Sequence, residues 1–510
     1  MELKLQKAQH EYYEKLRFAP FPCETMRENI VPDSCGDIAR IVDTTGVVCL
    51  TGRELTGDGR FCASGSVEAS VLYIPEKEEG LRSLHFQIPF QCYGEGQGDS
   101  SCENLDIRGE LRSIDTRVLN PRKVLTRAIL VLYPTLCRPV SLSVCTGLAG
   151  EDGGSIQLLR EQKQTRVTAG VREKEFIFTE ELPLSPGRGG AEEILSTRVD
   201  VRGADSKLIG SKLVVKGFLS VSALYRETGG RLGILQQELP FSQILEGNGF
   251  DEDCESEAAY RLVSLDCRVG SESAPDDACT LTLSVSLCTR VTVWKRLEID
   301  FIADLYSTAA NAVCQTEELE VSEDSQQSVR RQNVRELLET GSAVRSVVDT
   351  DISCGGAQLE GGEWKIPVWA RCLYVDEGDQ LGSVHREFTA VIPAELEGGG
   401  MDCEGEAACR GDVIANITPE GIELRFPVEC AVTASRRRRC LCVAGGELEE
   451  ENQDREPAPS LILRKMGEKE RLWDVAKQYR ATREGILSVN ELADESQITP
   501  DRLLLIPRAR

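Results

Sequence analysis

The sequence predicts a mainly β protein, in which three antiparallel β-sandwich-like repeats precede a small unit of helices and strands. The main observation is a segment in which every second residue is apolar and which ends on a tyrosine. It occurs three times with the same spacing, at Gly65–Tyr73, Gly217–Tyr225 and Ile366–Tyr374. Alternation with period two places the apolar residues on one face of a half-buried strand. Three copies of one β module indicate a repeat protein, and such proteins more often bind or assemble than catalyse.

Each tyrosine is followed by a second strand-like segment, and each of these leads to a proline preceded by an isoleucine or leucine. We therefore expect this second strand to be equivalent in the three repeats. The segments begin at Leu81, Leu232 and Leu381, and the prolines are Pro89, Pro240 and Pro393.

Residues 1–22 are expected to form a short N-terminal helix, because apolar side chains recur at a helical spacing until prolines end the pattern. The helix would dock on the first repeat or on a partner. The residues of the pattern are Leu5, Ala8, Tyr12 and Leu16, followed by Pro20 and Pro22.

Runs of alternating residues and the turns between them place the three repeats at residues 23–146, 150–316 and 326–445. A glycine-rich turn at 147–154 separates the first two repeats, and a polar stretch at 317–332 leads to the third. The free edges of such sheets are open to lateral pairing, so self-association remains open.

The pattern changes after residues 446–460, which hold acids and prolines with little to bury and predict an extended linker. Beyond it, residues 461–463 suggest a strand and residues 472–479 a helical stripe. Thr482 can cap a second helix, and residues 503–506 suggest a closing strand.

This C-terminal unit resembles the LysM domain over nearly all of residues 461–510. The resemblance rests on Leu-Trp-Asp-Val-Ala-Lys at 472–477, Asn-Glu-Leu at 490–492 and Leu-Leu-Ile-Pro at 504–507. It implies a βααβ fold with a shallow groove, which in that family binds N-acetylglucosamine polymers. The positions of this chain that the resemblance assigns to partner or glycan binding are Lys469, Glu470, Arg471, Leu472, Trp473, Asn490 and Leu492.

The turn on one side of the groove differs from the family pattern of Gly-Asp-Thr. It reads Lys469-Glu470-Arg471, without the glycine that lets a sugar approach the backbone closely. The ligand could therefore be a charged protein surface or a glycan. Trp473 and Asn490 also have a structural interpretation, Trp473 through packing and Asn490 through bonds to the backbone.

The repeats are similar to the SPOCS domain, through residues 25–33 and 119–123 of the first repeat and residues 192–195 and 212–217 of the second. The third departs most, with Ile366 in place of glycine. SPOCS repeats followed by one LysM domain resemble the spore-coat morphogenetic proteins of clostridia. The resemblance implies a non-enzymatic scaffold or adaptor at the forespore surface, on the mother-cell side, whose LysM domain binds a coat-basement morphogenetic ATPase. The alternative is an adaptor that binds peptidoglycan.

The composition agrees with a soluble assembly protein. The chain has 59 lysines and arginines against 84 acids, and its net charge of -25 disfavours binding to nucleic acids or anionic membranes. No stretch is long and apolar enough for a membrane span, and residues 1–18 lack the apolar core of a secretion signal. We therefore expect a cytoplasmic protein whose 20 cysteines are reduced.

The sequence offers no catalytic group, metal site or cofactor site. With three histidines and no Cys-x-x-Cys motif, it lacks a nucleophile with a histidine partner. His85 and His385 occupy matching repeat positions, which favours a structural role, and His10 falls on the predicted N-terminal helix. Four arginines precede Cys440 and Cys442, which indicates either a solvated basic turn or reactive thiols.

Overall fold

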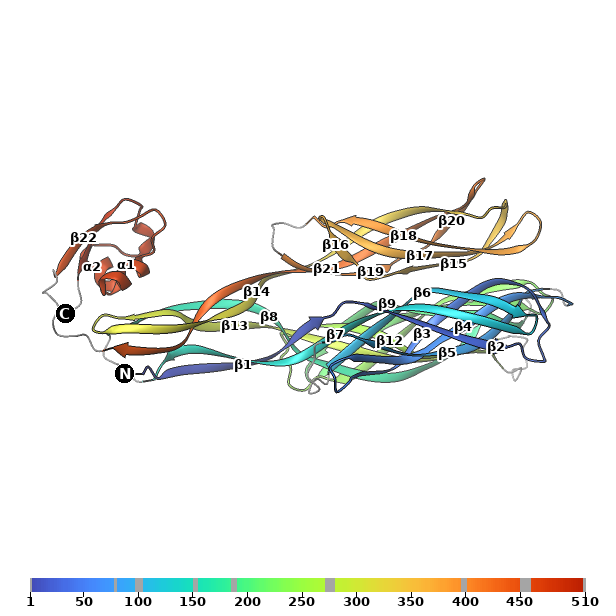
Figure 1. Ribbon diagram of the computed structural model, residues 1–510, viewed down its shortest axis with the longest axis horizontal. Coiled ribbons are helices and arrows are strands. Elements are labelled where there is room, and N and C mark those ends of the chain that lie inside the picture. The colour runs from blue at the N-terminus through green and yellow to red at the C-terminus, as the bar shows by residue number, and fades with distance from the viewer. Residues whose placement is uncertain are drawn as a thin grey trace.

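A computed structural model describes residues 2–77, 80–96, 104–149, 155–184, 190–270, 280–395, 401–449 and 460–507, with the backbone alone at 324 and 325. These residues form several antiparallel sheets and, near the C-terminus, two short α-helices (Figure 1). The prediction of a mainly β protein is confirmed. Within the described ranges, no helix has the length and apolar character that crossing a membrane requires.

The three tyrosine-terminated segments are strands, as predicted, and each pairs with a strand on either side. Their apolar faces are buried, with Val71 and Ile366 fully inaccessible to solvent. The three strands are β4 (Phe61–Pro75), β10 (Lys212–Glu227) and β17 (Glu363–Asp376). Their neighbours are β3 (Ile38–Leu55) and β5 (Arg82–Gly94), then β9 (Ala191–Ile209) and β11 (Leu232–Glu246), then β15 (Val344–Cys354) and β18 (Leu381–Pro393), with the short β16 (Gln358–Glu360) also on β17.

A second sheet covers each of these sheets and completes a β-sandwich, and apolar side chains from both sheets fill the space between them. In every repeat, the last long strand is the centre of this second sheet. The strands are β2 (Phe21–Ile30), β7 (Lys123–Leu148) and β6 (Asn104–Asn120) in the first repeat; β8 (Ile156–Pro183), β13 (Thr280–Ser307) and β12 (Glu255–Val269) in the second; and β14 (Asn311–Glu339), β21 (Gly421–Glu449), β19 (Met401–Cys409) and β20 (Ile414–Thr418) in the third.

The first and last strands of each repeat continue beyond the sandwich as a two-stranded ribbon, and the three ribbons form a stalk (Figure 1). β1 (Leu5–Arg17) pairs with the end of β7, the start of β8 with the end of β13, and the start of β14 with the end of β21. Val144, Phe301, Leu319 and Val443 are buried together inside the stalk. The three repeats therefore share one apolar core in addition to their own.

One prediction about the segments that flank the repeats is wrong, and a second segment, described only as polar, is a strand. Residues 5–17 form the strand β1 and not a helix, because pairing with β7 overrides the local spacing of apolar residues. His10 accordingly lies on a strand. Residues 317–332 are part of β14, where Leu319 and Val321 face the stalk core between exposed glutamates.

Parts of two further predicted connections lie outside the described residues. Of the acidic linker predicted at 446–460, residues 446–449 belong to β21 and are therefore not a linker, and residues 450–459 are outside the described ranges. Of the glycine-rich turn, residues 147–148 end β7 and residues 150–154 are outside them.

The sandwiches meet at an apolar cluster to which each repeat contributes equivalent residues. In every repeat, the leucine that precedes the tyrosine enters this cluster. Opposite that leucine, the neighbouring strand has a β-bulge, and the extra residue turns to the same cluster. The leucines are Leu72, Leu224 and Leu373, and the bulge residues are Val42, Leu195 and Val348.

The C-terminal unit consists of two strands and two helices, in the order that the sequence predicts, and it is drawn in red at one end of Figure 1. β22 (Leu461–Lys465) pairs with β23 (Leu503–Pro507). Between them come α1 (Leu472–Tyr479), α2 (Arg483–Val489) and a short 3-10 helix, η1 (Glu495–Gln497). The Thr482 side chain accepts a hydrogen bond from the Gly485 amide at 3.1 Å, which confirms the predicted cap of the second helix.

The cysteines differ from the expectation of reduced thiols at one place. Cys23 of β2 and Cys92 of β5 form a disulfide with 5.9 Å between their Cα atoms, whereas the other cysteines within the described ranges are free. The arginines at 436–439 lie within β21 and not in a turn. Burial raises the pKa of Cys440 and of Cys442, which opposes the thiolate form that a reactive cysteine needs.

Candidate functional site

The C-terminal unit folds around the inner face of α1. Leu472, Val475 and Ala476 are buried there against residues of α2 and β23. The helix begins after Arg471, whose guanidinium donates hydrogen bonds of 3.0 Å to both carboxylate oxygens of Asp474. These bonds lower the pKa of Asp474. The first turn of α1 is thus fixed at its exposed side by an ion pair and at its inner side by packing.

A groove of about 270 Å³ lies beside this turn, between the segment that follows β22 and the segment that precedes β23. Four of the predicted binding residues line it, namely Glu470, Arg471, Leu472 and Trp473. Leu159 of β8 also lines it, so the second repeat contributes to the site.

The polar groups around the groove are held in pairs. Glu470 accepts a hydrogen bond of 3.0 Å from the Gly467 amide and forms an ion pair with Arg464. Arg483 pairs with Glu495 on the opposite side. The groove therefore has an apolar floor and a rim of fixed, opposite charges, which suits a polar ligand or a protein surface better than a free ion.

The remaining predicted residues lie away from the groove lining. Lys469 is exposed on the neighbouring turn. Asn490 donates from Nδ2 to the carbonyls of Ile486 at 2.7 Å and Leu505 at 2.6 Å, and its Oδ1 accepts from the Leu505 amide at 2.8 Å. Leu492 is half-buried. The contacts of Asn490 favour its structural interpretation.

Trp473 lines the groove and also contacts the stalk. Its side chain is 3% exposed, its Nε1 donates to Asp304 Oδ2 at 2.8 Å, and its ring packs edge-on against Tyr306 with 4.9 Å between ring centroids. Asp304 and Tyr306 belong to β13 of the second repeat. Sequence reasoning missed Leu159, Asp304 and Tyr306, because a contact between residues 169 positions apart leaves no local pattern.

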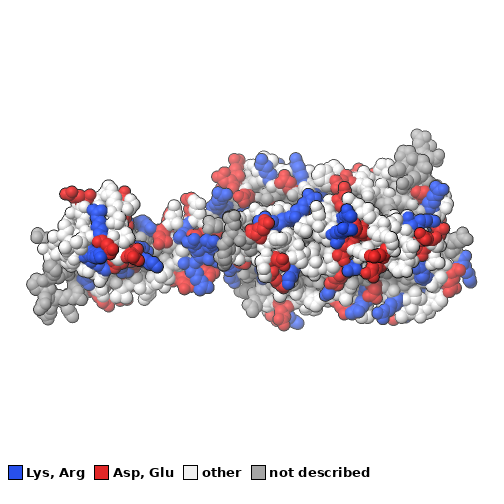
Figure 2. Space-filling view, turned by 90° about the horizontal axis from the view of Figure 1, so that it is seen from above, with Lys and Arg blue, Asp and Glu red and all other residues white. Residues whose placement is uncertain are grey.

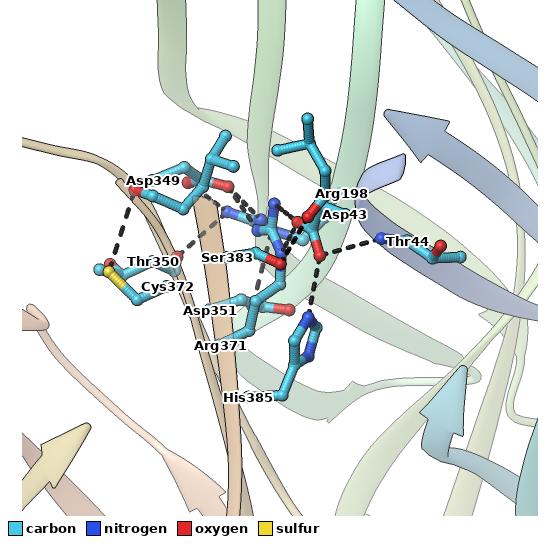
Figure 3. Close-up of polar contacts among 12 residues, drawn as sticks. Asp43, Thr44, Arg198, Asp349, Thr350, Asp351, Arg371, Cys372, Ser383 and His385 are labelled. Atoms are coloured by element: carbon cyan, nitrogen blue, oxygen red, sulfur yellow. Dashed lines mark hydrogen bonds and ion pairs between the residues drawn. The ribbon is translucent and has the colours of Figure 1, made fainter. Parts of the chain in front are cut away.

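A second cluster of polar residues lies where the three repeats meet (Figure 3). Arg371 of β17 donates from Nε to Asp43 Oδ2 at 2.5 Å and from Nη1 to Asp349 Oδ2 at 2.7 Å. Arg198 of β9 donates to both oxygens of Asp349, at 2.6 and 2.8 Å. His385 Nε2 lies 2.9 Å from Asp43 Oδ1. Each repeat thus contributes a charged side chain to one cluster.

The aspartates of this cluster are held in their ionised form. Burial alone would raise the pKa of Asp43, but Arg371 and His385 outweigh it and hold that pKa at about 2. Burial also opposes ionisation of Asp349, yet Arg198 and Arg371 lower its pKa. A carboxylate that is fully engaged by arginines is a poor general base, so the cluster joins the repeats and does not suit catalysis.

Similar polar contacts close the three sandwiches into a ring. Ser83 Oγ of the first repeat donates to the carbonyl of Ile194 in the second at 3.0 Å, and His85 Nε2 lies 2.8 Å from the same oxygen. In the third repeat, Ser383 Oγ donates to the carbonyl of Val42 in the first at 2.8 Å. Arg198 links the second repeat to the third. The two histidines at matching positions therefore both contact another repeat, His85 at a backbone carbonyl and His385 at the Asp43 carboxylate.

The outer surface carries mixed charge. Figure 2 shows acidic and basic side chains interspersed over the visible face of the sandwiches and the stalk. Across the described ranges, no group of three or more His, Cys, Asp or Glu residues is arranged to hold a metal ion.

Comparison with known proteins concerns the repeats. A family model described as the SipL, SPOCS domain matches residues 37–119 and 191–269. These segments contain β3 to β6 of the first repeat and β9 to β12 of the second. The third repeat lies outside the matched segments, but its sandwich is built in the same order. No curated protein and no solved structure matches the chain.

Proposed function

We propose that this protein is a non-enzymatic scaffold or adaptor for the assembly of the spore coat. The two matches to the SPOCS domain support a role in sporulation. The single observation that carries the scaffold is the closed ring of three sandwiches with a shared stalk, which holds the C-terminal unit at a fixed place. We place the protein in the mother-cell cytoplasm, at the surface of the forespore.

We further propose that the C-terminal unit is a LysM domain that binds a coat-basement morphogenetic ATPase. The exposed turn at Lys469 and Arg471 and the charged rim of the groove support a protein ligand. Aromatic rings often stack on sugars in glycan sites, but the ring of Trp473 packs against Tyr306 instead. Glycan binding to the groove remains the second candidate, because the groove is large enough for part of a sugar chain.

A pull-down from sporulating cells tests this proposal. The full chain carrying K469E and R471E should recover about tenfold less of the ATPase than the unchanged chain, because charge reversal on the exposed turn beside the groove opposes a complementary surface. The control is K465E, which reverses a charge on β22 outside the groove lining. Equal recovery by both variants would contradict the proposal, and retention of the full chain on purified peptidoglycan would support the alternative.

A further inference from the structure

The stalk of the second repeat ends beside the C-terminal unit, and the contact between them is built from specific side chains. We propose that this stalk tip is a dedicated docking site for the C-terminal unit, and that docking closes the Trp473 face of the unit to other ligands. The inference goes beyond the proposed function and does not depend on the identity of the partner.

Asp304 and Tyr306 of β13 make the central contacts. Asp304 accepts a hydrogen bond from Trp473 Nε1 at 2.8 Å, and its two oxygens lie 2.6 and 2.7 Å from Lys477 Nζ. Tyr306 Oη donates to the carbonyl of Ala481 at 2.7 Å, and the tyrosine is 4% exposed. Both residues therefore satisfy their polar groups on the C-terminal unit, and Tyr306 is buried by this contact.

The chemistry of the contact is that of a specific interface. The hydrogen bonds that the Asp304 carboxylate accepts from an indole N–H and an ammonium group are charge-assisted and directional. The edge-on packing of Tyr306 and Trp473 adds buried aromatic surface. Leu159, which pairs with Asp304 across the ribbon, belongs to the same apolar cluster as Trp473.

The other two ribbons of the stalk provide an internal comparison. Each ribbon has one β-bulge near its tip, so equivalent positions are found by counting from the bulge. The pair just beyond the bulge is Leu159 with Asp304 in the second repeat. In the first and third repeats it is Gln6 with Gly147 and Gln315 with Gly445.

The pair just beyond the bulge is glutamine with glycine in two ribbons and differs in the remaining one. A Cβ atom at Gly147 would lie 2.8 Å from Gln6 Oε1, and one at Gly445 would lie 2.9 Å from Gln315 Oε1. Glycine and glutamine thus form a matched pair in two ribbons. The second ribbon alone replaces this pair by an aspartate and a leucine.

The residue two places after this glycine or aspartate also sets the second ribbon apart from the other two. It is Tyr306 in the second repeat, but Ala149 in the first and Glu447 in the third. The residues that hold the C-terminal unit are therefore specific to one of three otherwise equivalent ribbons. A chance contact would not need all three changes at the same ribbon.

Docking has a direct consequence for recognition. The Trp473 face is occupied, and the groove is bordered on one side by Leu159 of the second repeat. A ligand that enters the groove therefore meets the second repeat as well as the C-terminal unit, and a ligand that needs the Trp473 ring must first displace Tyr306.

The double variant D304G/Y306A of the full chain tests the docking site. It gives the second ribbon the residues that the first ribbon carries at the same positions, so the ribbon itself should still fold. Hydrogen–deuterium exchange in peptides covering residues 472–481 should become at least about tenfold faster, because undocking removes their cover. Peptides of β1 and β14 should exchange as in the unchanged chain. D300A, on the exposed face of the same strand, is the control and should change neither.

Unchanged exchange at residues 472–481 in the double variant would overturn the proposal. A second measurement keeps it testable if the variant unfolds. Zero-length carbodiimide coupling of the unchanged chain should join Asp304 to Lys477, with a yield similar to that of Asp501 and Lys465, which lie 2.8 Å apart within the unit. Coupling of Asp501 to Lys465 without coupling of Asp304 to Lys477 would also overturn it.

Discussion

Asn490 follows the last turn of α2, and its side-chain amide bonds the backbone of β23 through both its nitrogen and its oxygen. The sequence allowed two interpretations of this residue, a ligand contact and a structural bond. Its amide is satisfied by Ile486 and Leu505 at distances between 2.6 and 2.8 Å, which leaves little of it for a ligand. The sequence could predict that Asn490 bonds to the backbone, but only the fold shows that its partners are Ile486 and Leu505.

We expect N490A to destabilise the C-terminal unit by about 2–4 kcal/mol, because three hydrogen bonds are lost and the Leu505 backbone groups lose their partner. The change should appear as faster hydrogen exchange in peptides that cover β23. S488A, at an exposed position of α2, is the matched control and should have little effect. Equal exchange in the two variants would show that Asn490 does not join α2 to β23.

Gly217 of β10 and Phe241 of β11 show how individual strands differ among the repeats. The glycine pairs with the phenylalanine, and a Cβ atom on it would lie 2.8 Å from the ring. In the third repeat, Ile366 pairs with Ala390, so the large and small residues have exchanged strands. This exchange explains why the third repeat lacks the glycine. It also shows that Pro393 is not equivalent to Pro240, because Pro393 pairs with Glu363 at the start of β17.

A double-mutant cycle at this pair tests the exchange. G217I should lower the stability of the chain by about 1–3 kcal/mol through crowding, and F241A by about 3–5 kcal/mol through a cavity. The double variant should cost clearly less than the sum, because the isoleucine fills the space that the ring leaves. Thermal unfolding midpoints of the four full-length proteins give the coupling. Additive losses would contradict the explanation.

Elements with a local sequence pattern could be predicted from the sequence, whereas elements decided by distant pairing could not. The tyrosine strands, the order of the C-terminal elements and the Thr482 cap depend on local patterns, and these were predicted correctly. The segment at 5–17 was not, because Leu5 and Tyr12 fit a helical stripe and only their pairing with β7 decides for a strand. The stalk could not be predicted for the same reason. Each of its ribbons pairs the first strand of a repeat with the last, and residues so far apart leave no local pattern.

On the scale of the whole molecule, the main feature is the closed ring with ionised carboxylates at its centre. The folded pKa of Asp43, about 2, lies below the value of about 4 for a free aspartate, so the unfolded chain binds more protons between these values. The stabilisation from Asp43 is complete above about pH 4 and is lost as the pH falls towards 2. It amounts to about 2 kcal/mol.

We therefore expect the free energy of unfolding to fall steeply between pH 4 and pH 2 and the D43N variant to lack part of this dependence. At neutral pH, D43N should be less stable by about 3 kcal/mol, because Arg371 loses a buried partner. Urea unfolding of both proteins across this pH range provides the measurement. Parallel pH profiles would show that folding does not lower the pKa of Asp43.

The tip of the stalk also sets an order for events during synthesis. The Leu3 amide donates to the carbonyl of Gly446 at 2.9 Å, and Glu2 forms a bridge with Glu447. Residues 2 and 3 must therefore wait for partners from the end of the third repeat. A nascent chain can complete its first sandwich early, but it seals the stalk only after residues 446 and 447 have been synthesised. A prematurely terminated product would leave that apolar end open to chaperones and proteases.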